Sequence, residues 1–140
     1  METKQIGSKH IIRVAKGEEI VTQLKKVCQK ENIKAGSIMG IGAAGSIEIG
    51  HFETGTKEYH SREFTGDLEI TSLMGNVSQK DGKPYLHIHI NFADEKLQGY
   101  AGHLNSAVIS ATFECIIEEF DGEIDRKFNS EIGLDLMDMS

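Results

Sequence analysis

The stretch PYLHIHINFADEKLQGYAGHL, residues 84–104, begins with a strict alternation of apolar and polar side chains. Alternate residues of a β-strand face the same side of the sheet. One side of this strand is apolar and carries Leu86, Ile88, Ile90 and Phe92. The other side carries Tyr85, His87, His89 and Asn91. The pattern therefore predicts a strand over residues 85–92, with one face in a core and two histidines on the opposite face.

The residues that follow predict a hairpin. Residues 93–96, Ala-Asp-Glu-Lys, have the composition of a turn, and residues 97–104 can return as a second strand. A third histidine, His103, would then lie alongside the first strand. Gly99 and Gly102 would let the returning backbone bend or approach its neighbour closely.

Upstream of the hairpin, one segment has the periodicity of a helix. Its apolar residues recur at helical spacing and are Ile20, Val21, Leu24, Val27 and Cys28. Glu18 and Glu19 precede them, where negative charge interacts favourably with the helix dipole. We therefore predict one helix over Glu18–Glu31, with its apolar stripe packed on a sheet.

Most of the remaining sequence alternates with a period of two and is punctuated by glycines, as strands are. The further predicted strands cover residues 8–15, 37–42, 46–53, 68–77 and 107–120, and Asp81-Gly82 predicts another turn. One face of the last strand carries Ile109, Ala111, Phe113, Cys115 and Ile117. The apolar residues of segment 129–139 indicate a short docking segment.

This order of elements predicts the fold class. One strand, one helix and then many hairpin strands are typical of an α+β fold, with a mainly antiparallel sheet packed on one principal helix. The chain has 140 residues and no segment with the composition of a linker. We therefore expect a single domain over residues 1–140.

The charge balance argues against a nucleic-acid surface. The chain has 15 basic and 22 acidic residues, a net charge of −7. Non-specific DNA affinity comes largely from basic side chains that displace counterions from phosphates. The predicted helix gathers Lys25, Lys26, Lys30 and Lys34, and we interpret these lysines as a solvated helix face.

The chain also lacks the sequence marks of export and of membrane insertion. The first ten residues, METKQIGSKH, contain no apolar core of a signal peptide, and no stretch approaches the ~20 apolar residues of a membrane span. Cys28 and Cys115 both lie within apolar patterns, which favours two core thiols over a disulfide. We expect a cytoplasmic protein with no membrane partner.

The three histidines are the candidate site. His87 and His89 are two residues apart on one strand, about 6.6 Å along the backbone, so both rings can approach one ion. If His103 joins them, three neutral imidazoles leave a position for water or substrate, which is how zinc is held in catalytic sites. Imidazole also suits iron, nickel and copper. The alternative is that these are surface histidines without a ligand.

Three further features of the sequence concern possible catalytic or cofactor-binding residues. Residues 40–45 spell GxGxxG, but strand-like alternation follows where a dinucleotide fold requires a helix, so these glycines indicate a bulge or a close crossing of backbones. No serine lies in a GxSxG elbow and neither cysteine has an activating neighbour. Glu48, Glu69 and Asp94 are acids that could act beside a metal or could be ordinary surface carboxylates.

The order of motifs along the chain resembles the plants and prokaryotes conserved (PPC) domain, over about residues 8–137. The residues and motifs are Arg13, Lys16-Gly17-Glu18-Glu19, Gly40-Ile41-Gly42-Ala43, Gly66-Asp67-Leu68-Glu69-Ile70, Leu86-His87-Ile88-His89, Gly102-His103-Leu104 and Thr112. The resemblance implies an antiparallel sheet packed on a helix, a homotrimer, and a metal, zinc first, at His87, His89 and His103. Prokaryotic members are often described as candidate DNA-binding proteins.

Two features of the plant relatives are missing here. Their segment for partner contacts, Gly-Arg-Phe-Glu-Ile-Leu, is replaced by Gly66-Asp67-Leu68-Glu69-Ile70-Thr71. The AT-hook core Arg-Gly-Arg-Pro, which reads DNA in the plant proteins, does not occur. The DNA-binding description therefore rests on analogy with the family.

Two hypotheses follow from the sequence. The first is a trimeric PPC-domain protein that binds zinc through the three histidines and has a DNA-binding or regulatory role. The second is a metal-dependent lyase or hydrolase acting on a small carboxylate or carbonyl compound, with a site similar to that of acetolactate decarboxylase. In the second case Glu69 or Asp94 would transfer protons beside the metal.

Overall fold

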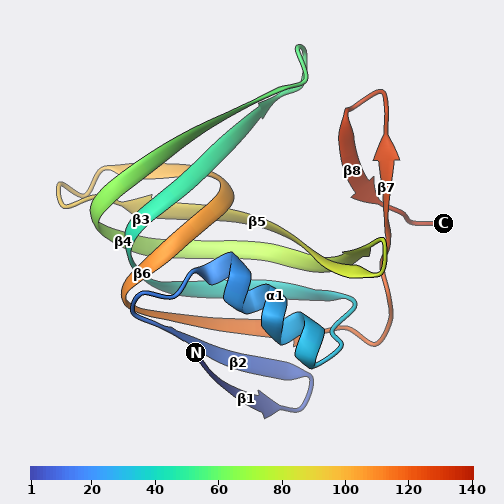
Figure 1. Cartoon of the computed structure of the whole chain (residues 1–140), viewed down its shortest axis with the longest axis horizontal. Helices are drawn as coiled ribbons and strands as arrows, with labels where there is room; N and C mark the ends of the chain where they lie inside the picture. The colour runs from blue at the N-terminus through green and yellow to red at the C-terminus, as the bar shows by residue number, and fades with distance from the viewer.

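The computed structural model describes all 140 residues as a mostly antiparallel sheet with one short helix (Figure 1). The elements are β1 (Glu2–Ile6), β2 (Lys9–Ala15), α1 (Ile20–Lys30), β3 (Gly36–Glu53), β4 (Glu58–Lys80), β5 (Lys83–Ala93), β6 (Gly99–Glu119), β7 (Arg126–Asn129) and β8 (Leu134–Met137). The predicted antiparallel sheet and principal helix are both present. The helical part is small, because α1 has only 11 residues.

The main sheet has the strand order β1-β2-β6-β3-β4-β5, and β5 also pairs with the beginning of β6. Strands β3, β4, β5 and β6 therefore form a closed circuit of paired strands. Strands β7 and β8 form a separate two-stranded sheet, the C-terminal hairpin. Figure 1 shows α1 lying across one face of the sheet. The C-terminal hairpin and the β3–β4 hairpin project on the side of the molecule away from β1 and β2.

The helix forms where its periodicity predicts, but it begins two residues later than the predicted Glu18. Glu19 is the N-cap, and its carboxylate accepts hydrogen bonds from the backbone N–H groups of Val21 and Thr22. The same carboxylate accepts one from the N–H of Ala107 in β6, at 3.2 Å. The buried helix residues are Ile20, Leu24, Val27 and Cys28. Glu19 thus caps the start of the helix and fixes it to the sheet.

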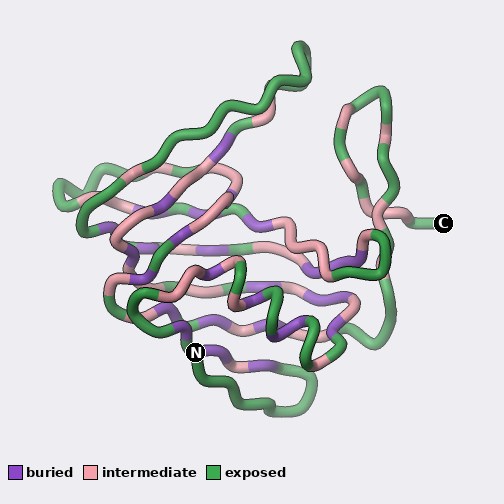
Figure 2. The backbone as a smooth tube through the Cα atoms, in the orientation of Figure 1, coloured by how far each residue is buried: buried purple, intermediate pink, exposed green.

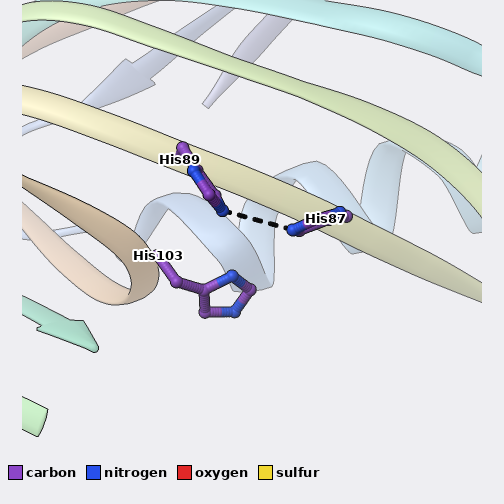
Figure 3. A group of neighbouring side chains, drawn as sticks. All are labelled: His87, His89 and His103. Atoms are coloured by element: carbon purple, nitrogen blue, oxygen red, sulfur yellow. Dashed lines mark hydrogen bonds between the residues drawn. The ribbon is translucent and has the colours of Figure 1, made fainter. Parts of the chain in front are cut away.

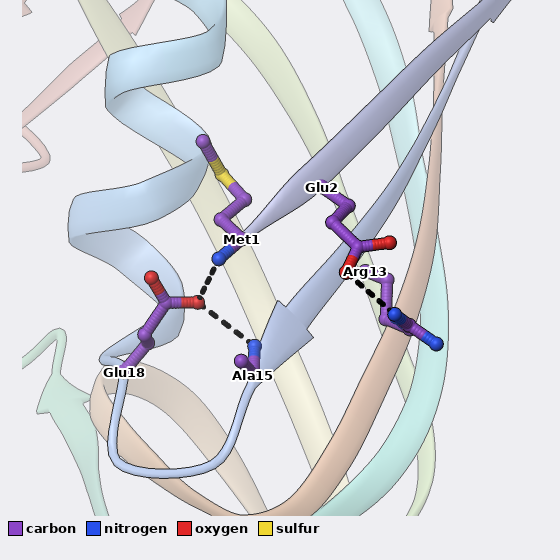
Figure 4. Close-up of polar contacts among 5 residues, drawn as sticks. All are labelled: Met1, Glu2, Arg13, Ala15 and Glu18. Atoms are coloured by element: carbon purple, nitrogen blue, oxygen red, sulfur yellow. Dashed lines mark hydrogen bonds and ion pairs between the residues drawn. The ribbon is translucent and has the colours of Figure 1, made fainter.

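The N-terminal strand is held by polar contacts that Figure 4 shows. Arg13 of β2 pairs with Glu2 of β1 at 2.6 Å, across the ladder that joins the two strands. The amino group of Met1 lies 2.7 Å from a carboxylate oxygen of Glu18, and that oxygen also accepts a hydrogen bond from the N–H of Ala15. These contacts attach β1 to the segment that enters α1.

The core lies between α1 and the sheet and continues inside the strand circuit. It is one cluster of 23 buried residues, in which Phe92 and Phe113 are the largest. Figure 2 shows buried positions alternating along the strands behind the helix, whereas the projecting hairpins are mainly exposed or half-buried. The predicted core face of β5 is confirmed for Ile88, Ile90 and Phe92, and Leu86 is half-buried.

The predicted core face of β6 is wrong at one residue, Ala111, which is exposed. Ile109 pairs with Ala44 and Phe113 pairs with Gly42, so a single residue of β3 faces three residues of β6. The extra residues leave the regular ladder, and Ala111 turns away from the core. A side chain at Gly42 would place its Cβ 2.3 Å from the carbonyl oxygen of Thr112, so only glycine fits this crossing.

Several strands are longer than the alternation predicts. The segments 37–42 and 46–53 are one strand, β3, whose register shifts occur at Gly40/Gly42 and Ala44/Ser46. The glycines at 40–45 therefore serve bulges and a close crossing, as expected. Strand β4 extends well beyond the predicted residues 68–77, and β6 joins two predicted strands. Strands β1 and β7 were not predicted, because neither presents an alternating apolar face.

The tail forms a hairpin rather than a single docking segment. Residues 134–137 pair with residues 126–129, and Lys57 in the β3–β4 turn donates a hydrogen bond to the carbonyl of Ser130 at 2.8 Å. The two projecting hairpins therefore touch each other. No helix in the chain has the length and apolar character to cross a bilayer.

Candidate metal centre

Three histidine rings converge on the face of the sheet opposite the β5 core residues (Figure 3). His87 and His89 project from β5, and His103 from β6 is the direct cross-strand partner of His89. One ring nitrogen from each residue lies within 4.8 Å of the others. The Nε2 atoms of His87 and His89 are 3.2 Å apart. The predicted hairpin, with residues 85–92 and 97–104 as its strands, is what brings the rings together.

The electrostatic surroundings favour neutral imidazoles. Burial, and then the neighbouring histidines, lower the pKa of His87 below its ordinary value, and Arg126 adds a smaller effect. The pKa of His103 is lowered by burial first and by His89 second. A metal binds the neutral ring, so a lowered pKa keeps the ligand nitrogens available near neutral pH. The donor set fits zinc and other divalent transition metals.

The cluster opens into a cavity of about 640 Å³. Its walls come from the β3–β4 hairpin, from β5 and β6, and from the C-terminal hairpin: Gly50, His51, Phe52, Thr54, Tyr59, Asn76, Tyr85, His87, His89, Gly102, His103, Arg126, Leu134, Asp135, Leu136 and Met137. Elements far apart in the sequence therefore surround the histidines, which face a space large enough for a small molecule.

Tyr59 borders the histidines and is held in place from two sides. Its hydroxyl donates a hydrogen bond to the amide oxygen of Asn105 at 2.5 Å, and its ring meets that of His103 edge to face with centroids 6.2 Å apart. A Cβ at Gly50 would lie 1.8 Å from the Tyr59 hydroxyl. The glycine at position 50 is thus what allows the tyrosine to lie against the sheet beside His103.

The family is evident from a comparison with known protein families. The model of the Plants and Prokaryotes Conserved (PCC) domain matches residues 1–121. The chain belongs to this family. The match contains all three histidines, whereas the C-terminal hairpin begins at Arg126 and lies beyond it.

Solved structures of similar proteins agree with this assignment. A candidate DNA-binding protein from Bacteroides thetaiotaomicron is 36% identical, with a TM-score of 0.96 over 98% of this chain and 96% of that one. A metal-containing protein from Archaeoglobus fulgidus is 34% identical, with a TM-score of 0.86 over 95% and 94%. A plant- and prokaryote-conserved protein from Pyrococcus horikoshii is 33% identical, with a TM-score of 0.86 over 99% and 94%.

A more distant likeness concerns the fold alone. Acetolactate decarboxylase from Bacillus subtilis is 12% identical, with a TM-score of 0.57 over 87% of this chain and 57% of that one. A comparison with curated proteins gave no match. The PCC-domain fold is therefore shared with this enzyme, and the likeness carries no information on activity.

The acids considered from the sequence do not line the cavity of this PCC-domain chain. Glu48, Glu69 and Asp94 are all absent from its walls. Asp94 instead closes the β5–β6 turn. Its carboxylate accepts hydrogen bonds from the N–H groups of Gln98 and Lys96, and these bonds, chiefly the one from Gln98, lower the pKa of Asp94. A proton-transfer role for Glu69 or Asp94 beside the histidines finds no support in this geometry.

The other histidines have separate surroundings. His51 lines the cavity but lies outside the cluster of three. His10 is buried and its Nε2 lies 3.0 Å from a carboxylate oxygen of Glu119. His60 forms an exposed group with Glu53 and Glu58 at the end of the β3–β4 hairpin. The two cysteines are buried, and burial raises the pKa of each thiol to about 12.

The sequence did not single out two residues that shape the cavity, Tyr59 and Arg126. Tyr85 was found on the histidine face of its strand, because alternation is a local signal. Tyr59 lies in the part of β4 that was not predicted as a strand, and Arg126 lies in the unpredicted β7. Neither belongs to a spaced motif, so only the paired strands reveal their place.

Proposed function

We propose that this protein binds a zinc ion through His87, His89 and His103. The observation that carries the proposal is the convergence of three ring nitrogens within 4.8 Å, produced by adjacent strands of a rigid sheet. Three imidazoles leave zinc with an exchangeable position, and the open cavity gives a small molecule access to it. The metal-containing relative from Archaeoglobus fulgidus, 34% identical, is consistent with this role.

Metal content tests the proposal. Elemental analysis of purified protein should find close to one equivalent of zinc per chain, with iron, nickel and copper measured in the same sample. His87→Ala and His103→Ala should lose the metal, while His51→Ala, which changes a histidine in the same cavity, should retain it. Full metal content in the two cluster variants, or wild-type protein that takes up no transition metal, would exclude the site.

We propose a homotrimer as the assembly. Its support is a set of large apolar side chains exposed on the histidine-bearing face: Met39 at 59%, Ile41 at 59% and Met74 at 67%. Met39 is the cross-strand partner of Met74 and of Ile116, and Met74 is that of His89, so the apolar row ends beside the metal ligands. Exposed apolar patches of this kind mark interaction surfaces.

Light scattering during size-exclusion chromatography tests the assembly. The wild type should have a mass three times that of the 15.5 kDa chain. Ile41→Glu should dissociate it, and Ile6→Glu, which alters an exposed isoleucine on the edge strand β1, should not. A monomeric wild type would refute the trimer and leave the metal site unaffected.

DNA binding is the second candidate function, favoured by the description of the relative from Bacteroides thetaiotaomicron, which is 36% identical. The charges oppose it: the chain has a net charge of −7, Lys30 of α1 is paired with Glu31 at 3.0 Å, and Lys34, beyond the helix, is paired with Glu123 at 2.6 Å. A titration with duplex DNA at two salt concentrations decides the question. No binding near physiological salt would remove this function.

A metal-dependent lyase or hydrolase is the remaining alternative, favoured by the cavity beside the histidines. Zinc-loaded protein should then convert a small carbonyl or carboxylate compound, and His103→Ala should abolish turnover while the protein remains folded. Equal turnover by His103→Ala would assign the activity to a contaminant.

A further inference from the structure

The wall of the cavity contributed by the C-terminal hairpin contains a fixed arginine. The Arg126 side chain donates three hydrogen bonds: Nε–H to the Ser78 hydroxyl at 2.7 Å, and the two terminal nitrogens to the Asp135 carbonyl at 2.8 Å and the Asn76 amide oxygen at 2.9 Å. Its guanidinium also stacks on the Tyr85 ring, 4.5 Å from the centroid. These contacts hold the group in one position and leave two of its five N–H donors without a partner in the chain.

All three acceptors of Arg126 are neutral, and no ion pair of the chain includes this arginine. The one carboxylate on the cavity wall, Asp135, is itself paired with Lys80. Burial lowers the pKa of Arg126, and the nearby Tyr85 and Asp135 oppose this effect only in part. The cavity therefore holds one uncompensated positive charge, and a divalent ion on the three histidines would add to it.

The same hairpin also brings apolar side chains to the cavity, and one of them, Met137, is the direct cross-strand partner of Arg126. Leu134, Leu136 and Met137 line the cavity from β8, and Phe52 lines it from β3. Leu134 and Leu136 are each 39% exposed, so a bound molecule could remove more of their surface from water. A fixed cation next to an apolar wall is complementary to a molecule with an anionic head and a short hydrocarbon chain.

We propose that this cavity binds a small organic monocarboxylate, with its carboxylate on Arg126 and its hydrocarbon chain against Leu134, Leu136 and Met137. The proposal rests on the proposed function only in so far as a metal on the three histidines strengthens the attraction for the anion. The planar guanidinium suits a carboxylate because its N–H donors can approach both oxygens. The C-terminal hairpin, which lies beyond the residues matched by the family model, thus supplies the residues that select the ligand beside the three histidines.

Calorimetric titration of the zinc-loaded protein with hexanoate tests the proposal. Hexanoate should bind at least about tenfold more tightly than hexanamide, which lacks the charge, and more tightly than acetate, which lacks the chain. Arg126→Gln should reduce hexanoate affinity at least about tenfold. Arg126→Lys should reduce it by less, because lysine keeps the positive charge but lacks the planar set of N–H donors. Arg62→Gln is the matched control, because Arg62 also stacks on an aromatic ring but lies outside the cavity.

Zinc content and circular dichroism of each variant show whether weaker hexanoate binding comes from loss of the metal or from loss of the fold. Because Arg126 also holds the hairpin, Leu136→Asn provides a second variant that keeps the arginine; it should weaken hexanoate binding and leave acetate binding unchanged. The proposal is overturned if folded Arg126→Gln binds hexanoate as the wild type does, if hexanamide binds equally well, or if inorganic phosphate binds as tightly as hexanoate.

The metal-free protein distinguishes this proposal from the metal proposal. If the wild type takes up no metal, the metal site fails, and the effect of Arg126→Gln on hexanoate binding to metal-free protein still decides the ligand. If the wild type binds zinc but no carboxylate, the metal site stands and the ligand proposal fails.

Discussion

The helix-covered face of the sheet and the histidine cavity are stabilised in different ways. Under α1, the buried helix residues are 0–2% exposed and all lie within one 11-residue element. The cavity is lined by 16 residues from two projecting hairpins and two strands, and many of them are polar and half-buried. The first region is stabilised by close packing of apolar volume. The second depends on strand register and on a small number of directed polar contacts.

The largest predicted effect belongs to the packed region. Phe113 has no exposed surface, so Phe113→Ala should lower the free energy of unfolding by about 3–5 kcal/mol through lost burial and a residual cavity. Urea denaturation measures this loss, which should be the same with and without zinc. A loss that appears only in the zinc-loaded protein would mean that core and cavity are coupled, contrary to the comparison.

The next effect belongs to the cavity and should depend on metal. At a free zinc concentration 100 times the dissociation constant, binding should stabilise the wild type by ~2.7 kcal/mol. His103→Ala should remove this increment and change the stability of the metal-free protein little, because His103 is only half-buried. Thermal denaturation with zinc or with a chelator measures both quantities. An undiminished zinc increment in His103→Ala would contradict the assigned ligand set.

A smaller effect is expected where α1 is fixed to the sheet. Glu19→Ala removes the cap of α1 and the acceptor for the Ala107 N–H, so it should cost about 0.5–2 kcal/mol. Lys26→Ala, on the exposed side of the same helix, is the control and should have little effect. Denaturation of both variants, together with their zinc content, checks that the loss is structural and leaves the metal site intact.

The smallest effect concerns pH and the metal-free cavity. The pKa values of His87 and His103 are lowered in the folded chain from an ordinary 6.5, so below about pH 6.5 the unfolded chain binds more protons than the folded one. The stability of metal-free protein should therefore decrease as the pH falls through this range and be independent of these groups above it. The double variant His87→Asn, His103→Asn should show a flatter profile between pH 5 and 7. An unchanged slope would assign the pH dependence to other groups.

The same contrast explains which features could be predicted from the sequence. Helix α1 and the core face of β5 were predicted because a period of 3.6 or of two is a property of consecutive residues. His87, His89 and His103 were found because one strand and one short hairpin place them together. Ala111 was wrongly predicted to face the core because a bulge depends on the partner strand. The alternation of residues within β6 does not indicate the bulge.

The sequence by itself determined the helix, most of the strands, the family and the three candidate ligands, because each is recorded in local spacing or in the order of motifs. Only the tertiary structure decided that the ring nitrogens of these ligands lie within 4.8 Å of one another, and that Tyr59 and Arg126 stand beside them. The physical reason is that a cavity is made by the surfaces of elements that pair over long distances. Tyr59 and Arg126 therefore line the same cavity as the histidines without belonging to their pattern in the chain.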